Sequence, residues 1–413
     1  MEGRNGSYRD VLRTRNFSLL WVGQVISNFG DRFNYMAVMA LIIFKWSGSA
    51  MDAGGMFMAW ALPALVFGPI AGVFVDRHNK KRVMILCDVV RAFLVLFLLY
   101  ANSLTQIYII IFSISSVSRF FYPARNAMIP ILVNKEELLV ANSLSQSTYE
   151  FSAIAGYALG GMLVGLLGPN NVFFIDSISY IVSALFIFKI SFKPIEKKLQ
   201  HTGSALSRIK KELFDGLSYS YNEKRIFYVI SLFTIALLFF GGVNLLWVVL
   251  IRDVLGLGIE GMGILESDFG AGMLIGTLLV GFFGRRFKNK LLIVSGIFIS
   301  SLGFLVIGLY PNVIIVMVFA FIAGFFISFV NIPSVTLLQK ITPEDMLGRV
   351  FSVLGTLTET AAILSMAAIG ILADLFSVQT LLVSMALILM VVSALAYLVP
   401  VDLEDEKSDS CDT

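Results

Sequence analysis

The chain has 413 residues, of which 57% are apolar or aromatic and only 14% are charged, and its mean hydropathy is +0.85. Soluble proteins carry roughly 25% charged residues, so this composition excludes an ordinary soluble protein. The net charge of +3 is too small and too scattered to indicate nucleic acid as a partner.

Long apolar segments recur along the whole chain. A helix that crosses a bilayer needs about 20 apolar residues, and hydropathy, turn residues and charge together predict twelve such helices. They are expected at residues 17–44, 53–75, 83–101, 104–128, 139–168, 171–190, 226–251, 260–284, 291–310, 312–338, 347–374 and 376–400. Turn residues separate neighbouring spans at Gly168-Pro169 and at Pro311-Asn312. The sequence therefore predicts an all-α membrane protein.

Basic residues set the expected orientation. If the N-terminus lies inside, Lys45 and Arg252 are the only Lys or Arg residues in outer loops, and Arg32, Arg91 and Arg119 lie within spans. All the others then lie on the inner side, as the positive-inside rule requires. Both termini are expected in the cytoplasm, and the protein in a cell membrane.

One long hydrophilic connection divides the chain. We expect a six-helix bundle at residues 1–190, a cytoplasmic linker at 191–225, a second six-helix bundle at 226–400 and an acidic cytoplasmic tail at 401–413. Apolar residues within the linker follow helical spacing, which predicts an amphipathic helix on the inner membrane surface. These residues are Leu206, Ile209, Leu213, Leu217 and Tyr221.

The two halves resemble each other. Tyr-Pro-Ala-Arg-Asn at 122–126 follows the fourth span, Ile-Pro-Ser-Val-Thr at 332–336 follows the tenth, and an acidic pair comes after each. Two repeat-related six-helix bundles place a ligand cavity near the bilayer midplane, and rocking of one bundle on the other exposes that cavity to alternate sides. This organisation predicts a transporter that works by alternating access.

The loop between the second and third spans carries a motif. It fits Gly-x-x-x-Asp-Arg-x-x-basic-basic, a loop signature of the major facilitator superfamily. Its residues are Gly72, Asp76, Arg77, Lys80 and Lys81. A glycine there permits close helix approach, and the basic cluster keeps the loop inside. We expect Asp76 to latch the halves by meeting the start of the eleventh span near Arg349.

Four segments together resemble the macrolide-efflux and enterobactin-exporter branch of the major facilitators. They are Asn28-Phe-Gly-Asp-Arg32 and residues 75–82, 123–127 and 347–352. The resemblance covers nearly the whole chain and implies twelve helices, export and proton antiport. One departure is Tyr157, which follows Gly156 where many drug exporters have proline.

Ionisable residues within spans are costly and usually face a cavity or a partner. Asp31 is expected near the midplane of the first span, beside Arg32. Arg119 and Glu150 share a depth on consecutive helices, which predicts an ion pair between them.

Glu359 occupies nearly the same place as Glu150 in the second half, but Phe329 stands where the first half has Arg119. A buried carboxylate without a nearby cation binds a proton more readily than one in water. Asp31 and Glu359 are therefore the first candidates for proton coupling, and Glu150 is the next. The alternatives remain open: Asp31 could pair with Arg32, and Glu359 could bond to helix hydroxyls such as Thr356.

Amides and aromatic rings near mid-depth are the expected lining of a substrate cavity, although such rings equally often pack against lipid. The candidates are Asn34, Trp60, Tyr149, Asn244, Trp247 and Asn331. Asp176, Glu266 and Asp268 are expected nearer the outer side, as gate residues or in contact with water.

The leading functional prediction is secondary, proton-coupled efflux of amphipathic organic compounds such as drugs or a siderophore, by a monomer without cofactor or bound metal. The same fold allows a lysophospholipid transporter, and Gly30-Asp31-Arg32 also resembles ferroportin, a divalent metal exporter. The only histidines, His78 and His201, lie in loops, which disfavours a metal carrier. A non-transporting receptor remains an alternative. No nucleophile, metal or nucleotide motif indicates an enzyme.

Overall fold

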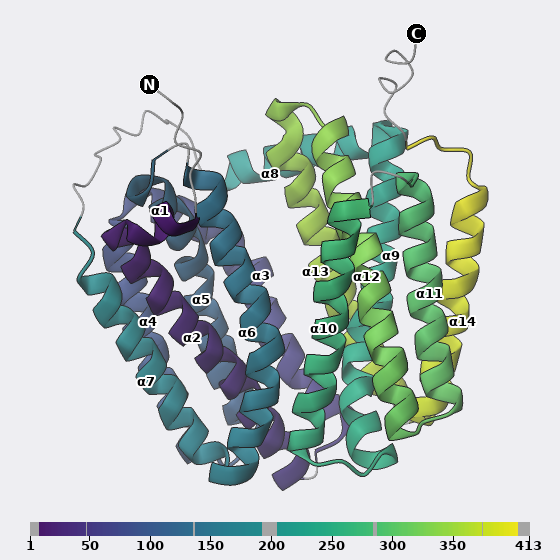
Figure 1. Ribbon diagram of the computed structural model, residues 1–413, viewed down its shortest axis with the longest axis horizontal. Coiled ribbons are helices and arrows are strands. Elements are labelled where there is room, and N and C mark those ends of the chain that lie inside the picture. The colour runs from purple at the N-terminus through teal and green to yellow at the C-terminus, as the bar shows by residue number, and fades with distance from the viewer. Residues whose placement is uncertain are drawn as a thin grey trace. The chain divides into compact units, whose positions relative to one another are not determined.

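A computed structural model describes residues 8–46, 48–134, 137–191, 205–283, 287–373 and 375–403. Its regular secondary structure is helical throughout these residues, with no strand (Figure 1). Eleven of the described helices are long and apolar enough to cross a membrane. Helix α2 (Arg15–Met39) is not among them, because polar residues such as Gln24 and Asp31 lower its hydropathy. The predicted all-α membrane fold is confirmed, while the first span and the orientation of the termini stay predictions.

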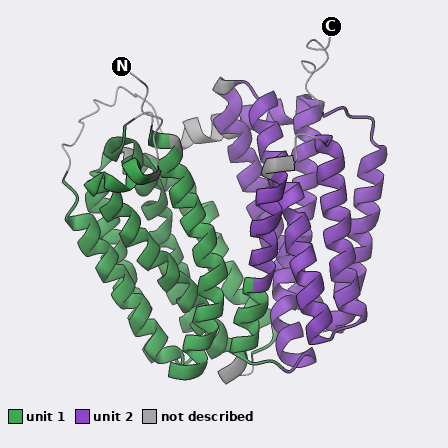
Figure 2. Cartoon of the chain, viewed as in Figure 1, with its two compact units in different colours: residues 1–205, 257–267 green, residues 206–256, 268–413 purple. Residues whose placement is uncertain are grey.

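The chain forms two compact units (Figure 2). Unit 1 comprises Met1–Ala205 with Leu257–Ser267, and unit 2 comprises Leu206–Gly256 with Asp268–Thr413. The division at 205/206 falls inside the expected linker, of which residues 192–204 lie outside the described part. Residues 257–267, at the start of the eighth expected span, group with unit 1, an assignment that hydropathy does not indicate.

Unit 1 is built on α2 and α4, each of which packs against two other helices. Its helices are α1 (Tyr8–Arg13), α2, η1 (Ala40–Lys45), α3 (Ala50–Arg77), α4 (Lys80–Phe97), η2 (Leu98–Tyr100), α5 (Leu104–Leu132), α6 (Leu138–Leu167) and α7 (Pro169–Phe188). Helix α2 packs on α6 and α7, and α4 packs on α5 and α7. The predicted turn between α6 and α7 is confirmed: Gly168 has a φ of 77°, which favours glycine, and Pro169 begins α7.

Unit 2 repeats this packing. Its helices are α8 (Ala205–Asn222), α9 (Lys224–Val249), η4 (Leu250–Val254), α10 (Ile259–Phe283, whose start belongs to unit 1), α11 (Asn289–Leu309), α12 (Val313–Ile341), α13 (Glu344–Ala373) and α14 (Val378–Leu398). Helix α9 packs on α13 and α14, and α11 packs on α12 and α14. The side chain of Asn312 accepts a hydrogen bond from Ile314 N at 3.0 Å and so starts α12 after the predicted break.

Glycines allow α10 and α12 to approach closely within unit 2. A Cβ atom at Gly276 would lie 3.0 Å from the carbonyl carbon of Phe325, and one at Gly272 would lie 3.0 Å from Phe325 N. These distances are too short for an ordinary contact. Gly272 and Gly276 therefore serve helix packing.

Gly276→Ala is expected to destabilise unit 2, because the added methyl group forces two backbones apart at a cost of about 1–3 kcal/mol. The measurement is the melting temperature of the purified protein in detergent. Gly355→Ala is the matched control, since a Cβ at Gly355 meets no described atom within 4 Å. Equal melting temperatures for the two variants would refute this packing.

Candidate functional site

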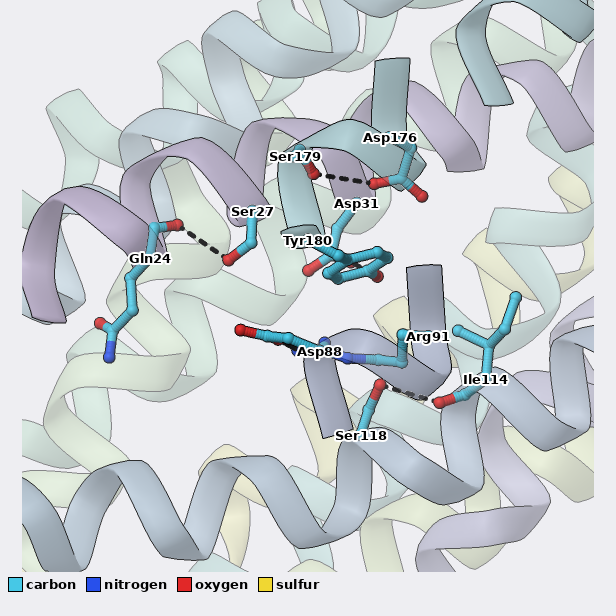
Figure 3. A network of polar contacts seen from close by, with 10 residues as sticks. All are labelled: Gln24, Ser27, Asp31, Asp88, Arg91, Ile114, Ser118, Asp176, Ser179 and Tyr180. Carbon is cyan, nitrogen blue, oxygen red and sulfur yellow. Dashed lines mark hydrogen bonds and ion pairs between the residues drawn. The ribbon is translucent and has the colours of Figure 1, made fainter. Parts of the chain in front are cut away.

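Charged side chains from three helices gather inside unit 1 (Figure 3). Asp31 comes from α2, Asp88 and Arg91 come from α4, and Asp176 comes from α7. Asp88 and Asp176 are fully buried, and Arg91 is 2% exposed. We call these four residues, together with Tyr180 of α7, the acidic network.

The buried pair of the acidic network lies within one turn of α4. Arg91 Nη2 donates to Asp88 Oδ1 in a salt bridge between residues three apart. The Arg91 guanidinium carbon also lies 4.3 Å from the centre of the Tyr180 ring and 4.5 Å from that of Phe121. Ion pairing and the two aromatic faces offset the cost of burying the cation.

The other two carboxyl groups have neutral hydrogen-bond donors. Tyr180 Oη donates to Asp31 Oδ1. Asp176 accepts from Asn34 Nδ2 at 2.6 Å and from Ser179 Oγ at 3.2 Å. Asp176 is fully buried, so the alternative that it contacts water is wrong, and Asn34, one of the candidate cavity-lining residues, donates to this carboxyl group.

Gly30 lets α2 approach α7 at the acidic network. A Cβ atom at this position would lie 2.9 Å from Ser179 Cβ and would also collide with the Asp176 carboxylate. Any larger residue would therefore displace Ser179, one of the two donors to Asp176. This gives Gly30, in the segment Asn28-Phe-Gly-Asp-Arg32, a specific structural role.

Arg32 points into a separate cluster of aromatic rings in unit 1. Its Nη1 donates to Tyr157 Oη at 2.9 Å, and its guanidinium carbon lies 4.8 Å from the centre of the Tyr149 ring. The Tyr35 ring lies 5.3 Å from that of Tyr157 and 5.6 Å from that of Trp60. We call these five residues the aromatic cluster. The aromatic cluster contains two of the predicted lining residues, Trp60 and Tyr149. Arg32 bonds to Tyr157, whereas Asp31 bonds to Tyr180.

The predicted ion pair between Arg119 and Glu150 is wrong. Arg119 Nη2 donates to the carbonyl oxygen of Trp60 at 3.4 Å. Glu150 is exposed and accepts from Gln146 Nε2, one turn earlier on the same helix, at 2.7 Å. Equal depth along two helices does not determine which way a side chain points around each helix axis.

The loop motif is only partly described. The side chain of Asp76 lies outside the described residues, Arg77 is exposed and Lys80 is half-buried. Lys81 Nζ donates to the carbonyl oxygen of Ile190 at 2.7 Å. A Cβ atom at Gly72 would meet no described atom within 4 Å, so the expected close helix approach is not found there.

Arg349, the expected partner of Asp76, has a partner within unit 2. Its Nη1 lies 3.6 Å from Asp215 Oδ2 of α8. Gly216 brings the two helices together, because a Cβ there would lie 2.8 Å from the Arg349 carbonyl oxygen. Helix α8 is therefore packed on the start of α13.

The remaining candidates lie apart in unit 2. The structure gives Glu359 no hydrogen bond or ion pair with another described residue, and Thr356 bonds to the Ser352 carbonyl oxygen instead. Asn244 is exposed and bonds to the Phe240 carbonyl oxygen at 3.0 Å, Asn331 is half-buried, and Trp247 is buried. Among the described residues, no group of three or more His, Cys, Asp and Glu could hold a metal ion.

Asp88 and Tyr180 are not among the residues predicted from the sequence, and Arg91 is predicted only as a charge within a span. Asp88 and Arg91 are spaced three residues apart in an apolar helix, a pattern that indicates a pair on one helix face. That signal was present in the sequence. Tyr180 had none, because a tyrosine in an apolar span is common.

Comparisons with known proteins agree with this architecture. A family described as transmembrane secretion effector matches residues 8–413. An MFS-type transporter of Bacillus subtilis is 31% identical over 87% of each chain. Macrolide efflux protein A of Streptococcus pyogenes is 28% identical over 88% of this chain and 90% of its own length. The crystal structure of the nucleoside transporter NupG, in its D323A form, superimposes with a TM-score of 0.74, at 15% identity, over 92% of this chain and 98% of that one.

Arg91→Met is expected to destabilise the protein by about 3–5 kcal/mol, because it leaves the buried Asp88 carboxylate without its cation. The double variant Asp88→Asn/Arg91→Met should recover most of that loss. Melting temperatures of the single and double variants in detergent measure the coupling. A double variant as unstable as the sum of the single variants would contradict the pairing.

Proposed function

Because the chain belongs to the transmembrane secretion effector family of major facilitator transporters, we propose that it exports amphipathic organic compounds by alternating access, in exchange for protons. It is a multi-pass transporter of the cell membrane and not an enzyme. The observation that carries the proton coupling is the excess of buried carboxyl groups over cations in the acidic network.

The charges of the acidic network do not balance. Its three carboxyl groups share one cation, and Arg91 already pairs with Asp88. Asp31 and Asp176 are left with neutral donors. An ionised carboxylate in such surroundings is costly, and binding a proton removes that cost. Asp31 and Asp176 are therefore the groups proposed to take up and release protons.

The aromatic cluster is the proposed contact for the cargo. Aromatic faces bind the apolar part of an amphipathic compound, and the phenolic hydroxyl groups offer polar contacts. A divalent metal would prefer carboxylate or imidazole ligands, so the cluster favours an organic cargo. The similarity to macrolide efflux protein A supports the same class.

Helix α2 connects the two proposed functions. Asp31 belongs to the acidic network, and its neighbour Arg32 belongs to the aromatic cluster. A change of charge at Asp31 that shifts α2 against α7 would therefore also move Arg32. This gives proton exchange a direct mechanical route to the cargo.

Other sequence candidates keep secondary proposed roles. Glu359, without a partner among the described residues, is a second candidate for proton exchange, and the exposed Glu150 is a weaker one. Asp76 is proposed to bias the balance between inward-open and outward-open states. Asp76→Asn should then change the accessibility of engineered cysteines at the two membrane faces.

Asp31→Asn and Asp176→Asn are each expected to reduce export driven by an imposed pH gradient by at least tenfold. Cargo counterflow, which needs no proton exchange, should persist, because the aromatic cluster is intact. Purified protein in liposomes allows both measurements. Asp253→Asn is the control, since Asp253 is an exposed carboxylate beside Arg252. Full gradient-driven export by both network variants would refute the assignment.

Tyr149→Ala is expected to raise KM for the cargo by about tenfold, because one aromatic face contributes about 0.5–1.5 kcal/mol beyond its buried area. Tyr149→Phe keeps the ring and should resemble the wild type. Transport of macrolides, dyes, siderophores, lysolipids and divalent metals by the wild type in liposomes identifies the cargo. Transport of metals alone would contradict an organic cargo.

A further inference from the structure

The first turns of α10 belong to unit 1 and pack against α6. A Cβ atom at Gly263 would lie 2.5 Å from the carbonyl oxygen of Tyr157, a distance too short for any side chain. One turn later, Ser267 Oγ donates to the carbonyl oxygen of Ile154 at 2.5 Å. Glu266 directly precedes Ser267 in the chain, so the same contact holds it next to α6.

The Glu266 carboxylate lies next to the aromatic cluster. It interacts electrostatically with Arg32, Tyr35 and Tyr157 of that cluster. Glu266 is half-buried, as are four of the five residues of the aromatic cluster. A solute that reaches these rings can therefore also reach the carboxylate.

The oxygens of Glu266 have no bonded partner. Within the described ranges they accept no hydrogen bond and form no ion pair, and neither oxygen is fully shielded. Asp31 and Asp176 differ, because both have neutral donors on neighbouring helices. An ionisable group within a span requires a partner or a cavity. An accessible carboxylate can receive that partner from a bound solute.

Arg32 compensates this carboxylate only in part. The structure records no ion pair between the two side chains, and Arg32 bonds instead to Tyr157 and lies over the Tyr149 ring. Arg32 also interacts electrostatically with Asp31. Two carboxyl groups therefore share one guanidinium group, and their surroundings favour a further positive charge. Tyrosine and tryptophan faces attract cations as well.

We propose that Glu266 recognises a positive charge on the cargo, so that the exported compounds are amphipathic organic cations such as protonated amines. The carboxylate faces the cationic group, while the rings of the aromatic cluster contact its apolar part and attract its charge. A neutral compound of similar shape gains only the apolar contact. This inference rests on the aromatic cluster as the proposed cargo contact and adds the sign of the charge that the cargo carries.

Binding of two aryl phosphorus compounds to the purified full-length protein tests this recognition. Tetraphenylphosphonium is a cation and triphenylphosphine oxide is neutral, and calorimetry in detergent measures both affinities without a pH gradient. The wild type should bind the cation at least tenfold more tightly, because a contact between opposite charges is stronger than a neutral one. Glu266→Gln should remove most of this preference and leave binding of the neutral compound within about twofold. Glu260→Gln is the matched control, since Glu260 is an exposed carboxylate of the same helix, and should keep the preference.

A second measurement uses the wild type alone. An apolar carbodiimide modifies carboxyl groups in apolar surroundings, and mass spectrometry of peptides locates the modified residue. Tetraphenylphosphonium should reduce the modification of Glu266 at least fivefold, and this result decides the question if Glu266→Gln does not fold.

Two results would overturn the proposal: a preference for the cation that persists in folded Glu266→Gln, or modification of Glu266 that the cation does not reduce. Equal loss of the preference in Glu260→Gln would also overturn it, because the effect would then not be specific to Glu266. Equal binding of both compounds by the wild type would refute charge recognition but leave an organic cargo in place. Failure of this proposal and failure of the proposed export are therefore distinguishable.

Discussion

The sharing of one guanidinium among three carboxyl groups is the constraint on which unit 1 depends. Charge is expensive away from water, so Arg91 must pair with Asp88 and also lie against two aromatic rings. The remaining carboxyl groups then need donors from neighbouring helices, which ties α2 to α7 through Tyr180 and Asn34. The contacts that hold these helices together therefore involve the same carboxyl groups that are proposed to exchange protons.

Asp31 and Arg32 are consecutive residues of α2 with opposite charges, and their side chains contact different neighbours. Successive side chains on a helix are about 100° apart, so Asp31 can bond to Tyr180 while Arg32 lies among the rings of Tyr149 and Tyr157. Gly30 and Gly156 let α7 and α6 come close enough for this. Because a helix moves as a rigid element, the coupling proposed between protons and cargo needs no longer chain of contacts.

Sequence patterns predict the features that follow from hydropathy and turn residues, namely the membrane spans and the breaks between them. Spans broken at Gly168 and Asn312, and an ionisable site at Asp31, follow from such patterns. Contacts around the helix axis do not, because a span with apolar residues on every side gives little indication of its rotation. For this reason the sequence patterns do not predict that Arg119 donates to the Trp60 carbonyl oxygen rather than pairing with Glu150. They also do not predict which residues donate to Asp176.

The internal repeat extends to packing but not to charge. Aligned through Pro123 and Pro333, Asp31 corresponds to Gly241, and a Cβ there would lie 2.9 Å from Ala362 Cα. Where unit 1 places a carboxylate beside a neighbouring helix, unit 2 brings two backbones into contact. Gly241 has no ionisable side chain, so this contact needs no compensating charge and cannot exchange a proton. The proton exchange proposed at Asp31 therefore has no counterpart at Gly241.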